Sequence, residues 1–243
     1  GAAAAHFGAR IARCLLTAPD FDPDDRLLAF LEAQKPDVLF LCTPNNPTGR
    51  TLPRGLLESV LALAARQGTR VLLDECFLDF TDAESAKALL PRYPNLLILK
   101  AFTKSYALAG VRVGYCLTAD AALLSAMAAC TQPWNVSLLA QAAGVAALRE
   151  QDWLARAKEI LTCERAYMTQ ELTQLGFSVC PSEANYLLFS APVGLDAALL
   201  REGIAIRSCA NYAGLGAGWY RTAVRLREEN EALLDAMRRV TEE

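Results

Sequence analysis

The sequence predicts an α/β fold, with a mostly parallel central sheet and flanking helices, followed by a small C-terminal α+β domain. Three observations predict it. Short β-rich runs alternate with helical patterns as far as residue 130, which is typical of parallel strands joined by helices. The pattern then becomes helical over about 137–174, and short strands flanking a helix follow it. We therefore expect two domains, over residues 1–150 and 151–243.

Four apolar runs are the expected strands of the first domain. They read DVLFLC at 37–42, RVLLDE at 70–75, NLLILKAF at 95–102 and RVGYCL at 112–117. Helical spacing of apolar residues predicts helices over about 56–66 and 120–129. Because sheets of this kind bind their ligands beyond the carboxyl ends of the strands, the residues that carry chemistry should follow these runs.

The second domain begins with the helical region over 137–174, which is interrupted near Glu150. Four short runs are its expected strands: FSVC at 177–180, ANYLLF at 184–189, IAIRSC at 204–209 and YRTAVRL at 220–226. Helices are expected over about 195–202 and from Glu228 to about Val240. This mixture of short strands and helices predicts a smaller α+β unit.

Composition and charge exclude several classes of partner. Of the 243 residues, 53% are apolar and 21% charged, so the chain can bury a real core. A formal net charge of −3 offers no attraction for a nucleic-acid backbone or an anionic membrane. No apolar run reaches the ~18 residues that would span a bilayer, and the first residues lack the features of a signal peptide. We expect a cytoplasmic protein that binds neither nucleic acid nor membrane.

Cysteine and histidine usage excludes several chemistries. The eight cysteines are dispersed with no C-x-x-C pair, and we expect them to be reduced and structural. His6, the only histidine, has no Cys or His ligands around it, which disfavours a metal site or a Ser/His hydrolase. No G-x-G-x-x-G motif follows a strand, so a Rossmann dehydrogenase is also disfavoured.

Polar residues follow the expected strands, as the fold class requires. Residues 43–50 read TPNNPTGR, a loop that holds two amides at a strand end, although N-P and T-G pairs are also ordinary turn formers. Asp74 lies at the end of the second strand, where a carboxylate needs a partner such as a cationic ligand nitrogen. Lys104 and Arg112 follow the third strand, and together they fit an imine-forming lysine with an anion clamp.

Together and in this order, these motifs resemble the cofactor motifs of the class I/II aminotransferase family of fold-type I pyridoxal phosphate enzymes. The resemblance runs from about residue 20 to the C-terminus and implies that residues 1–150 form part of that family's cofactor-binding large domain. It also implies pyridoxal 5'-phosphate as the cofactor and a homodimer as the assembly. Asn46 would then contact the 3'-oxygen of the cofactor, and Asp74 would keep the pyridine nitrogen protonated. Lys104 would form the imine and Arg112 would hold the phosphate.

Some positions depart from the family pattern. Phe77 stands where many members carry a tyrosine that donates to the 3'-oxygen, so Asn46 would act alone there. Ala101 replaces a frequent Ser or Thr that contacts the phosphate, and Thr103 is expected to compensate. Family members also carry an N-terminal arm, a phosphate-binding glycine turn and a ring-stacking aromatic residue before the region that this sequence covers. We therefore expect about the first third of the enzyme to be absent.

The C-terminal half carries a more specific resemblance. QPWNVS at 132–137, PSEANYLL at 181–188, IRSCANY at 206–212 and WYRTAVR at 219–225 are similar to the threonine-phosphate decarboxylase branch of the family, a relative of histidinol-phosphate aminotransferase. The resemblance implies that Arg221 binds the substrate carboxylate and Arg207 the substrate phosphate, with Asn46 beside the substrate as well. Guanidinium forks match both anions. The alternative is that Arg207, Arg221 and Arg225 are surface residues on edge strands.

Three hypotheses for function follow. The first is decarboxylation of L-threonine O-3-phosphate to (R)-1-amino-2-propanol O-2-phosphate, a step of cobalamin biosynthesis. The second is transamination of a phosphorylated amino compound such as histidinol phosphate, which would use the same cofactor residues. The third is a truncated, non-catalytic remnant of the family that at most dimerises.

Overall fold

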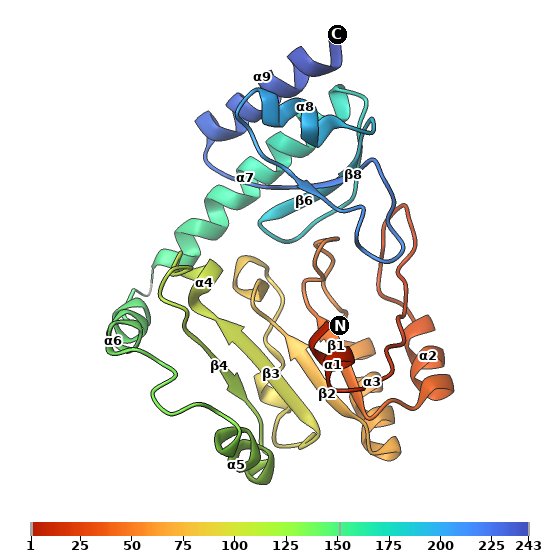
Figure 1. Ribbon diagram of the computed structural model, residues 1–243, viewed down its shortest axis with the longest axis vertical. Helices are drawn as coiled ribbons and strands as arrows, with labels where there is room; N and C mark the ends of the chain where they lie inside the picture. The colour runs from red at the N-terminus through yellow and green to blue at the C-terminus, as the bar shows by residue number, and fades with distance from the viewer. Residues whose placement is uncertain (1, 151, 243) are drawn as a thin grey trace.

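A central four-stranded sheet forms the lower half of the molecule in Figure 1. This computed structural model describes residues 2–150 and 152–242. The strands lie in the order β1-β2-β3-β4, where β4 is antiparallel to β3 and the other neighbours are parallel. Their bounds are β1 Val38–Cys42, β2 Arg70–Asp74, β3 Leu96–Ala101 and β4 Gly114–Leu117. The carboxyl ends of β1, β2 and β3 therefore meet at one edge of this sheet.

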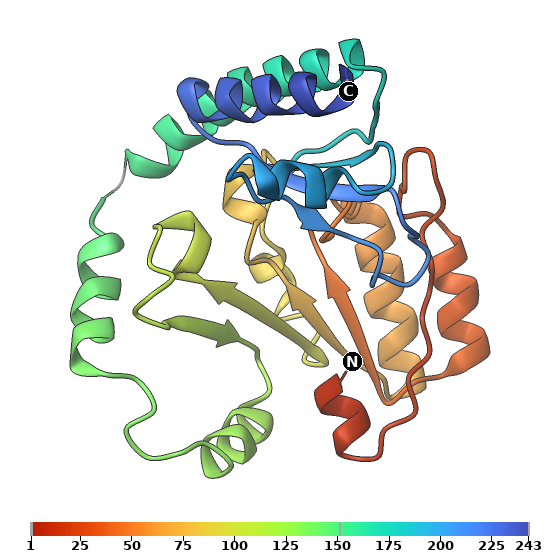
Figure 2. The ribbon, with the colours of Figure 1, turned by 45° about the horizontal axis from the view of Figure 1, so that its top comes forward.

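Helices pack against one face of the first sheet, and others lie beyond its β4 edge (Figures 1 and 2). The α-helices are α1 Ala2–His6, α2 Arg26–Gln34, α3 Arg54–Gln67, α4 Phe102–Ser105, α5 Ala121–Ala129 and α6 Leu138–Ala147, and the 3-10 turns are η1 Leu78–Phe80 and η2 Ala86–Leu89. Helices α2 and α3 lie side by side (Figure 2), and their buried leucines share a core with Val71 and Ile98 of the strands. Helix α3 ends at Gln67 and is capped by Gly68, whose φ of 74° is the left-handed conformation that glycine adopts easily.

A second four-stranded sheet lies above the first in Figure 1, in the order β5-β6-β8-β7 with every neighbouring pair antiparallel. Its strands are β5 Ser178–Val179, β6 Tyr186–Ser190, β7 Arg207–Ser208 and β8 Trp219–Ala223, and its helices are α7 Trp153–Gln174, α8 Leu195–Arg201 and α9 Arg227–Glu242. The helices bury Met168, Leu199 and Leu234 against Phe189 and Tyr220 of the strands. A separate hydrophobic core thus supports this sheet.

The fold class predicted from sequence is confirmed, with differences at element ends. Helix α4 begins at Phe102, where the sequence predicted a continuing strand, and β4 begins two residues after its predicted start at Arg112. The backbone of Arg112 has a φ of 54°, which a regular strand cannot contain. The expected run at 204–209 contributes only Arg207–Ser208 to the sheet. No helix within the described ranges is long and apolar enough to cross a bilayer.

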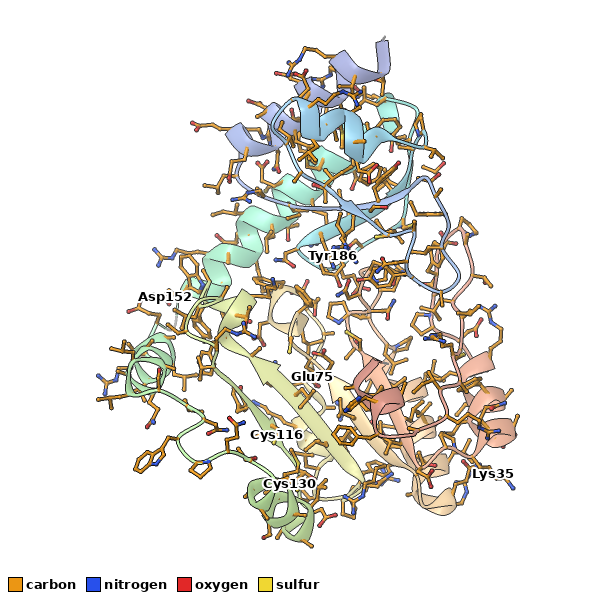
Figure 3. All side chains as sticks on the ribbon, viewed as in Figure 1. Lys35, Glu75, Cys116, Cys130, Asp152 and Tyr186 are labelled. Carbon is orange, nitrogen blue, oxygen red and sulfur yellow. The ribbon has the colours of Figure 1, made fainter. Side chains whose placement is uncertain are left out.

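The loop after β1 joins the two sheets. The phenol of Tyr186 donates to the carbonyl of Asn45 at 2.9 Å, and the amide of Glu183 donates to the carbonyl of Gly49 at 2.9 Å. Tyr186 lies on the side of the second sheet that faces the first (Figure 3). The turn-forming sequence of this loop therefore serves to place two amides, Asn45 and Asn46, between the sheets.

Candidate active site

Asp74 ends β2, between Cys42 of β1 and Leu99 of β3. Its Oδ1 accepts a hydrogen bond from the backbone N–H of Cys76 at 2.9 Å, which orients the half-buried carboxylate. Among the described residues, no basic side chain lies within ion-pairing distance of it. Burial, together with the charge of Asp74, raises the pKa of Cys42 and of Cys76 to about 12, so both thiols stay neutral. The carboxylate is thus held in place and available to a cationic ligand atom.

Lys104 lies in α4, directly after β3, and its side chain is exposed. Its Nζ lies 6.0 Å from the centre of the Phe77 ring, three residues after Asp74. Phe77 in turn meets Tyr186 edge to face, with ring centres 5.1 Å apart. The structure therefore brings the lysine beside the segment that follows Asp74, with Thr103 half-buried next to it.

Asn46 and Arg221 are joined by a hydrogen bond between the two halves of the chain. The guanidinium Nη1 of Arg221 donates to Oδ1 of Asn46, and the phenol of Tyr212 donates to the same oxygen at 3.4 Å. Because both contacts use the oxygen of the Asn46 amide, its NH2 group is left to donate to a ligand. The guanidinium of Arg221 also lies 5.1 Å from the centre of the Tyr186 ring, within the range of a cation–π contact.

Arg207 lies on β7 directly opposite Arg221 on β8. Opposed residues of an antiparallel pair project on the same face of the sheet, so the two guanidiniums lie on one face. Nη2 of Arg207 donates to Oδ1 of Asn211 at 3.1 Å, and within the described ranges neither arginine has a carboxylate partner. Two like charges placed opposite each other are unfavourable unless an anion lies between them. The pair therefore favours an anionic ligand.

Arg112 stands apart from the other predicted site residues. Its exposed guanidinium donates to the carbonyl of Ala109 at 3.1 Å, within its own loop. In the part of the chain that the structure describes, no hydrogen bond joins it to Thr103 or Lys104. Its predicted role at the cofactor phosphate requires this side chain to leave the carbonyl of Ala109.

A cavity of about 790 Å³ lies beside these residues. It runs between the N-terminal segment and β1, and it reaches Asn46 and Tyr212. Asp74, Lys104 and the two opposed arginines are not in its lining. The chemistry of the side chains, rather than the cavity, therefore locates the site.

Sequence reasoning did not assign a role to the two tyrosines of the site. Tyr186 is 3% exposed, and burial raises its pKa, so its phenol remains a neutral donor. It supports Asn45, Phe77 and Arg221 together. The signal available in the sequence was its position in the ANYLLF run, just as Tyr212 follows Arg207 in IRSCANY.

Residues 10–237 match the family model described as aminotransferase class I and II, and the chain belongs to this family. It is 41% identical over 219 residues to the threonine-phosphate decarboxylase of Salmonella typhimurium, covering 87% of this chain and 60% of that relative. It is 38% identical over 233 residues to the histidinol-phosphate aminotransferase of Mycobacterium sp. strain JLS, covering 93% and 59%. The chain thus spans about three fifths of the length of these curated relatives.

Solved structures show the same fold. The histidinol-phosphate aminotransferase of Clostridium acetobutylicum superposes with a TM-score of 0.84 at 28% identity, covering 90% of this chain and 67% of that one. The corresponding enzyme of Sinorhizobium meliloti, in complex with pyridoxal-5'-phosphate, has a TM-score of 0.76 at 26% identity, covering 88% and 60%. The family resemblance predicted from sequence is confirmed, and pyridoxal phosphate is the cofactor of this family.

The residues present fit that cofactor. Asp74 offers an oriented carboxylate without a basic partner, Lys104 offers an exposed amine, and the NH2 of Asn46 is left to donate. These are an anion for a protonated ring nitrogen, a nucleophile for an aldehyde and a donor for a phenolic oxygen.

Proposed function

We propose that the protein that contains this chain decarboxylates L-threonine O-3-phosphate with pyridoxal 5'-phosphate as cofactor. The bond between the α-carbon and the carboxylate breaks, CO2 leaves and one proton is added to the α-carbon, which gives (R)-1-amino-2-propanol O-2-phosphate. The observation that carries the proposal is the pair of opposed guanidiniums, Arg207 and Arg221, of which Arg221 is bonded to Asn46. The similarity to the Salmonella decarboxylase supports the same reaction.

The two arginines divide the anions of the substrate between them. Arg221 binds the carboxylate, because its contact with Asn46 places it on the side of the cofactor residues. Arg207, on the edge strand and exposed, binds the phosphate. Both are charge-assisted contacts, which are the strongest hydrogen bonds available to such oxygens.

The cofactor, when bound, supplies a sink for the electron pair released at the α-carbon. Asp74 holds the proton on the ring nitrogen, and the NH2 of Asn46 donates to the 3'-oxygen. Lys104 holds the cofactor through its Nζ and then carries the proton that replaces CO2 at the α-carbon. Arg112 and Thr103 bind the phosphate of the cofactor in this proposal.

The same proposal covers the organisation and setting of the protein. Residues 1–150 are part of a cofactor-binding large domain, and residues 151–243 are a small domain. The protein works as a homodimer in the cytoplasm, in cobalamin biosynthesis. The two cores described above support the division of the chain, and a third cluster packs Phe21 against Cys180, Leu188 and Cys209 of the second domain.

A second candidate is transamination of a phosphorylated amino compound such as histidinol phosphate. The similarity to the Mycobacterium and Clostridium enzymes favours it. It uses the same cofactor residues and the same phosphate contact at Arg207, but a proton rather than CO2 leaves the α-carbon.

The decisive experiment measures CO2 release from L-threonine phosphate by the protein, with and without 2-oxoglutarate. We expect stoichiometric CO2 and no consumption of the oxo acid. Faster turnover of histidinol phosphate with 2-oxoglutarate would transfer the assignment to the second candidate. Absence of both reactions, together with no covalent capture of pyridoxal phosphate at Lys104 after borohydride reduction, would overturn both.

Arg207→Ala tests the phosphate contact. The loss of a charge-assisted, bidentate contact should lower kcat/KM for threonine phosphate by about 30-fold to several thousandfold. Free threonine should be a poor substrate of the parent and hardly worse with the variant. Arg201→Ala, at the exposed end of α8, is the matched control and should leave both values unchanged. Equal losses for the two substrates would exclude Arg207 as the phosphate ligand.

A further inference from the structure

Three charged side chains lie together behind the proposed site. Nζ of Lys100 lies 2.6 Å from Oδ1 of Asp79 and 3.7 Å from Oε2 of Glu75. Only 11% of the Lys100 side chain and 1% of the Glu75 side chain are exposed. None of the three is among the residues that the proposed function uses.

Glu75 fixes the segment that follows Asp74. Its Oε2 accepts from the hydroxyl of Ser85 at 2.6 Å, and its Oε1 accepts from the backbone N–H of Ala86 at 2.7 Å. Because Glu75 is the next residue after Asp74, these bonds hold the end of β2 against η2. Figure 3 labels Glu75 within the first sheet.

Asp79 links this cluster to the turn that carries Lys104. Its Oδ2 accepts from the hydroxyl of Ser105 at 2.7 Å, and Ser105 is the residue after Lys104. Ser105 is 1% exposed, and its carbonyl accepts from Nε1 of Trp153 at 2.7 Å. One carboxylate in η1 therefore holds Lys100 of β3 with one oxygen and the turn of α4 with the other.

The protonation states suit this bridge. Burial lowers the pKa of Lys100, but the hydrogen bond and charge of Asp79, with the charge of Glu75, outweigh it and hold that pKa above its usual value. Burial and the charge of Asp79 raise the pKa of Tyr106, and burial is the largest cause of the raised pKa of Tyr115. Lys100 therefore keeps its charge in this buried position.

Stability alone is a weak reason for such a cluster. Buried ion pairs gain little over apolar residues of the same size, because desolvation of the charges offsets their attraction. Helix α4, in contrast, has only four residues, too few for its own hydrogen bonds to hold it. The turn that carries Lys104 therefore depends on side-chain anchors for its position.

We propose that Asp79 is a positioning residue, which holds the Lys104 turn against the strand end that carries Asp74 by bridging Lys100 and Ser105. The inference rests on the proposed function, because it concerns the placement of the amine that binds the cofactor. It predicts that the bridge acts on Lys104 without contacting the cofactor or the substrate.

The test compares three variants of the protein. Ser105→Ala removes only the bond between Asp79 and the Lys104 turn and leaves the ion pair with Lys100. Asp79→Asn weakens both arms of the bridge. Asp82→Asn is the matched control, since the Asp82 side chain is 99% exposed and pairs only with Lys158 among the described residues.

The first readout is amide hydrogen exchange of the peptide over residues 102–108 in the cofactor-free protein. We expect exchange to rise by about tenfold or more in Ser105→Ala and Asp79→Asn, because a charge-assisted hydrogen bond to the turn is lost. Exchange over 70–74 in β2 should not change, which separates a local effect from a loss of global stability. Asp82→Asn should match the parent in both peptides. Exchange over 102–108 within about twofold of the parent in Ser105→Ala would overturn the proposal.

The second readout is capture of pyridoxal phosphate, measured by borohydride reduction and peptide mass mapping. Capture at Lys104 should exceed capture at the exposed Lys87 in the parent and in Asp82→Asn. In Ser105→Ala and Asp79→Asn it should fall toward the Lys87 level, and the visible absorption band of the bound cofactor should shift. Unchanged capture and an unchanged band in Ser105→Ala would overturn the positioning role. No preference for Lys104 in the parent would instead contradict the proposed function, and hydrogen exchange would then decide the bridge alone.

Discussion

Gly49 is the position where one added methyl group should have the largest effect on the loop between the sheets. Its backbone has a φ of 77°, in the left-handed region that residues with a Cβ rarely adopt. A Cβ built on Gly49 would lie 2.1 Å from Oγ and 2.7 Å from Cβ of Ser182. Because Ser182 precedes Glu183, whose amide is bonded to the carbonyl of Gly49, the segment cannot move away without losing that bond.

Two costs add in Gly49→Ala. The left-handed conformation costs an alanine about 1–2 kcal/mol. Overpacking against Ser182 costs about 1–3 kcal/mol more. We therefore expect the free energy of unfolding to fall by about 2–5 kcal/mol. Gly203→Ala is the matched control, since Gly203 has a φ of 79° and a Cβ there would meet no atom within 4 Å. Gly203→Ala should lower the free energy of unfolding only by the conformational cost, about 1–2 kcal/mol.

Urea unfolding followed by tryptophan fluorescence measures both variants under the same conditions. The double variant Gly49→Ala/Ser182→Gly should recover much of the steric part and none of the conformational part. Equal losses for Gly49→Ala and Gly203→Ala, within about 0.5 kcal/mol, would refute the claim that the loop is packed against the second sheet at this point.

Two further predictions concern single carboxylates. Asp74→Asn should slow turnover by about a thousandfold, or ~4 kcal/mol, because an amide cannot hold the ring nitrogen of the cofactor protonated, whereas Asp82→Asn should keep the parent rate. Glu164→Gln should lower the free energy of unfolding by about 1–3 kcal/mol at neutral pH. The reason is that hydrogen bonds from Arg227 hold the pKa of Glu164 below its usual value; burial partly opposes this effect, and the hydrogen bond from Asn230 adds to it. That contribution is present above the ordinary pKa of about 4.3 and is lost as pH falls through the lower, folded-state pKa, so the gap in stability should close in acid.

Each of these has a clear contrary outcome. Turnover of Asp74→Asn within about tenfold of the parent would remove Asp74 from its proposed role. A difference in stability between Glu164→Gln and the parent that persists unchanged in strong acid would show that shape, rather than charge, explains the contact with Arg227 and Asn230.

Strands β1 and β2 of the first sheet were predictable because burial leaves a strong local signal. The runs at 37–42 and 70–75 have apolar centres with polar residues at or just beyond their ends, and β1 and β2 agree with them to within one residue at each end. Helix α4 was not predictable in the same way. Its first residue, Phe102, ends an apolar run that predicts a strand, and the anchors that turn the chain there come from Asp79 and Trp153, which lie elsewhere in the sequence.

Contacts across the chain left no local signal. Asn46 and Arg221 are separated by 175 positions, and only the family resemblance suggested that they belong to one site. The turn formers around Asn46 predicted a rigid loop. They did not predict that the phenol of Tyr186 would donate a hydrogen bond to the carbonyl of Asn45 in that loop. Side-chain pairing of this kind depends on tertiary packing, which periodicity does not report.

The oxygen and the NH2 group of the Asn46 side-chain amide have different hydrogen-bonding roles. Its oxygen accepts from Arg221 and Tyr212, which belong to the second sheet and its loop, and its NH2 group is left to donate to a ligand. Under the proposed function, a substitution there would change the binding of cofactor and of substrate together, so neither could be altered independently through this position. Aspartate would strengthen the oxygen side and remove the donor, whereas alanine would remove both. Arg207, to which the proposed function gives a role toward the substrate alone, is therefore the position where we expect substrate selectivity to change separately from cofactor binding.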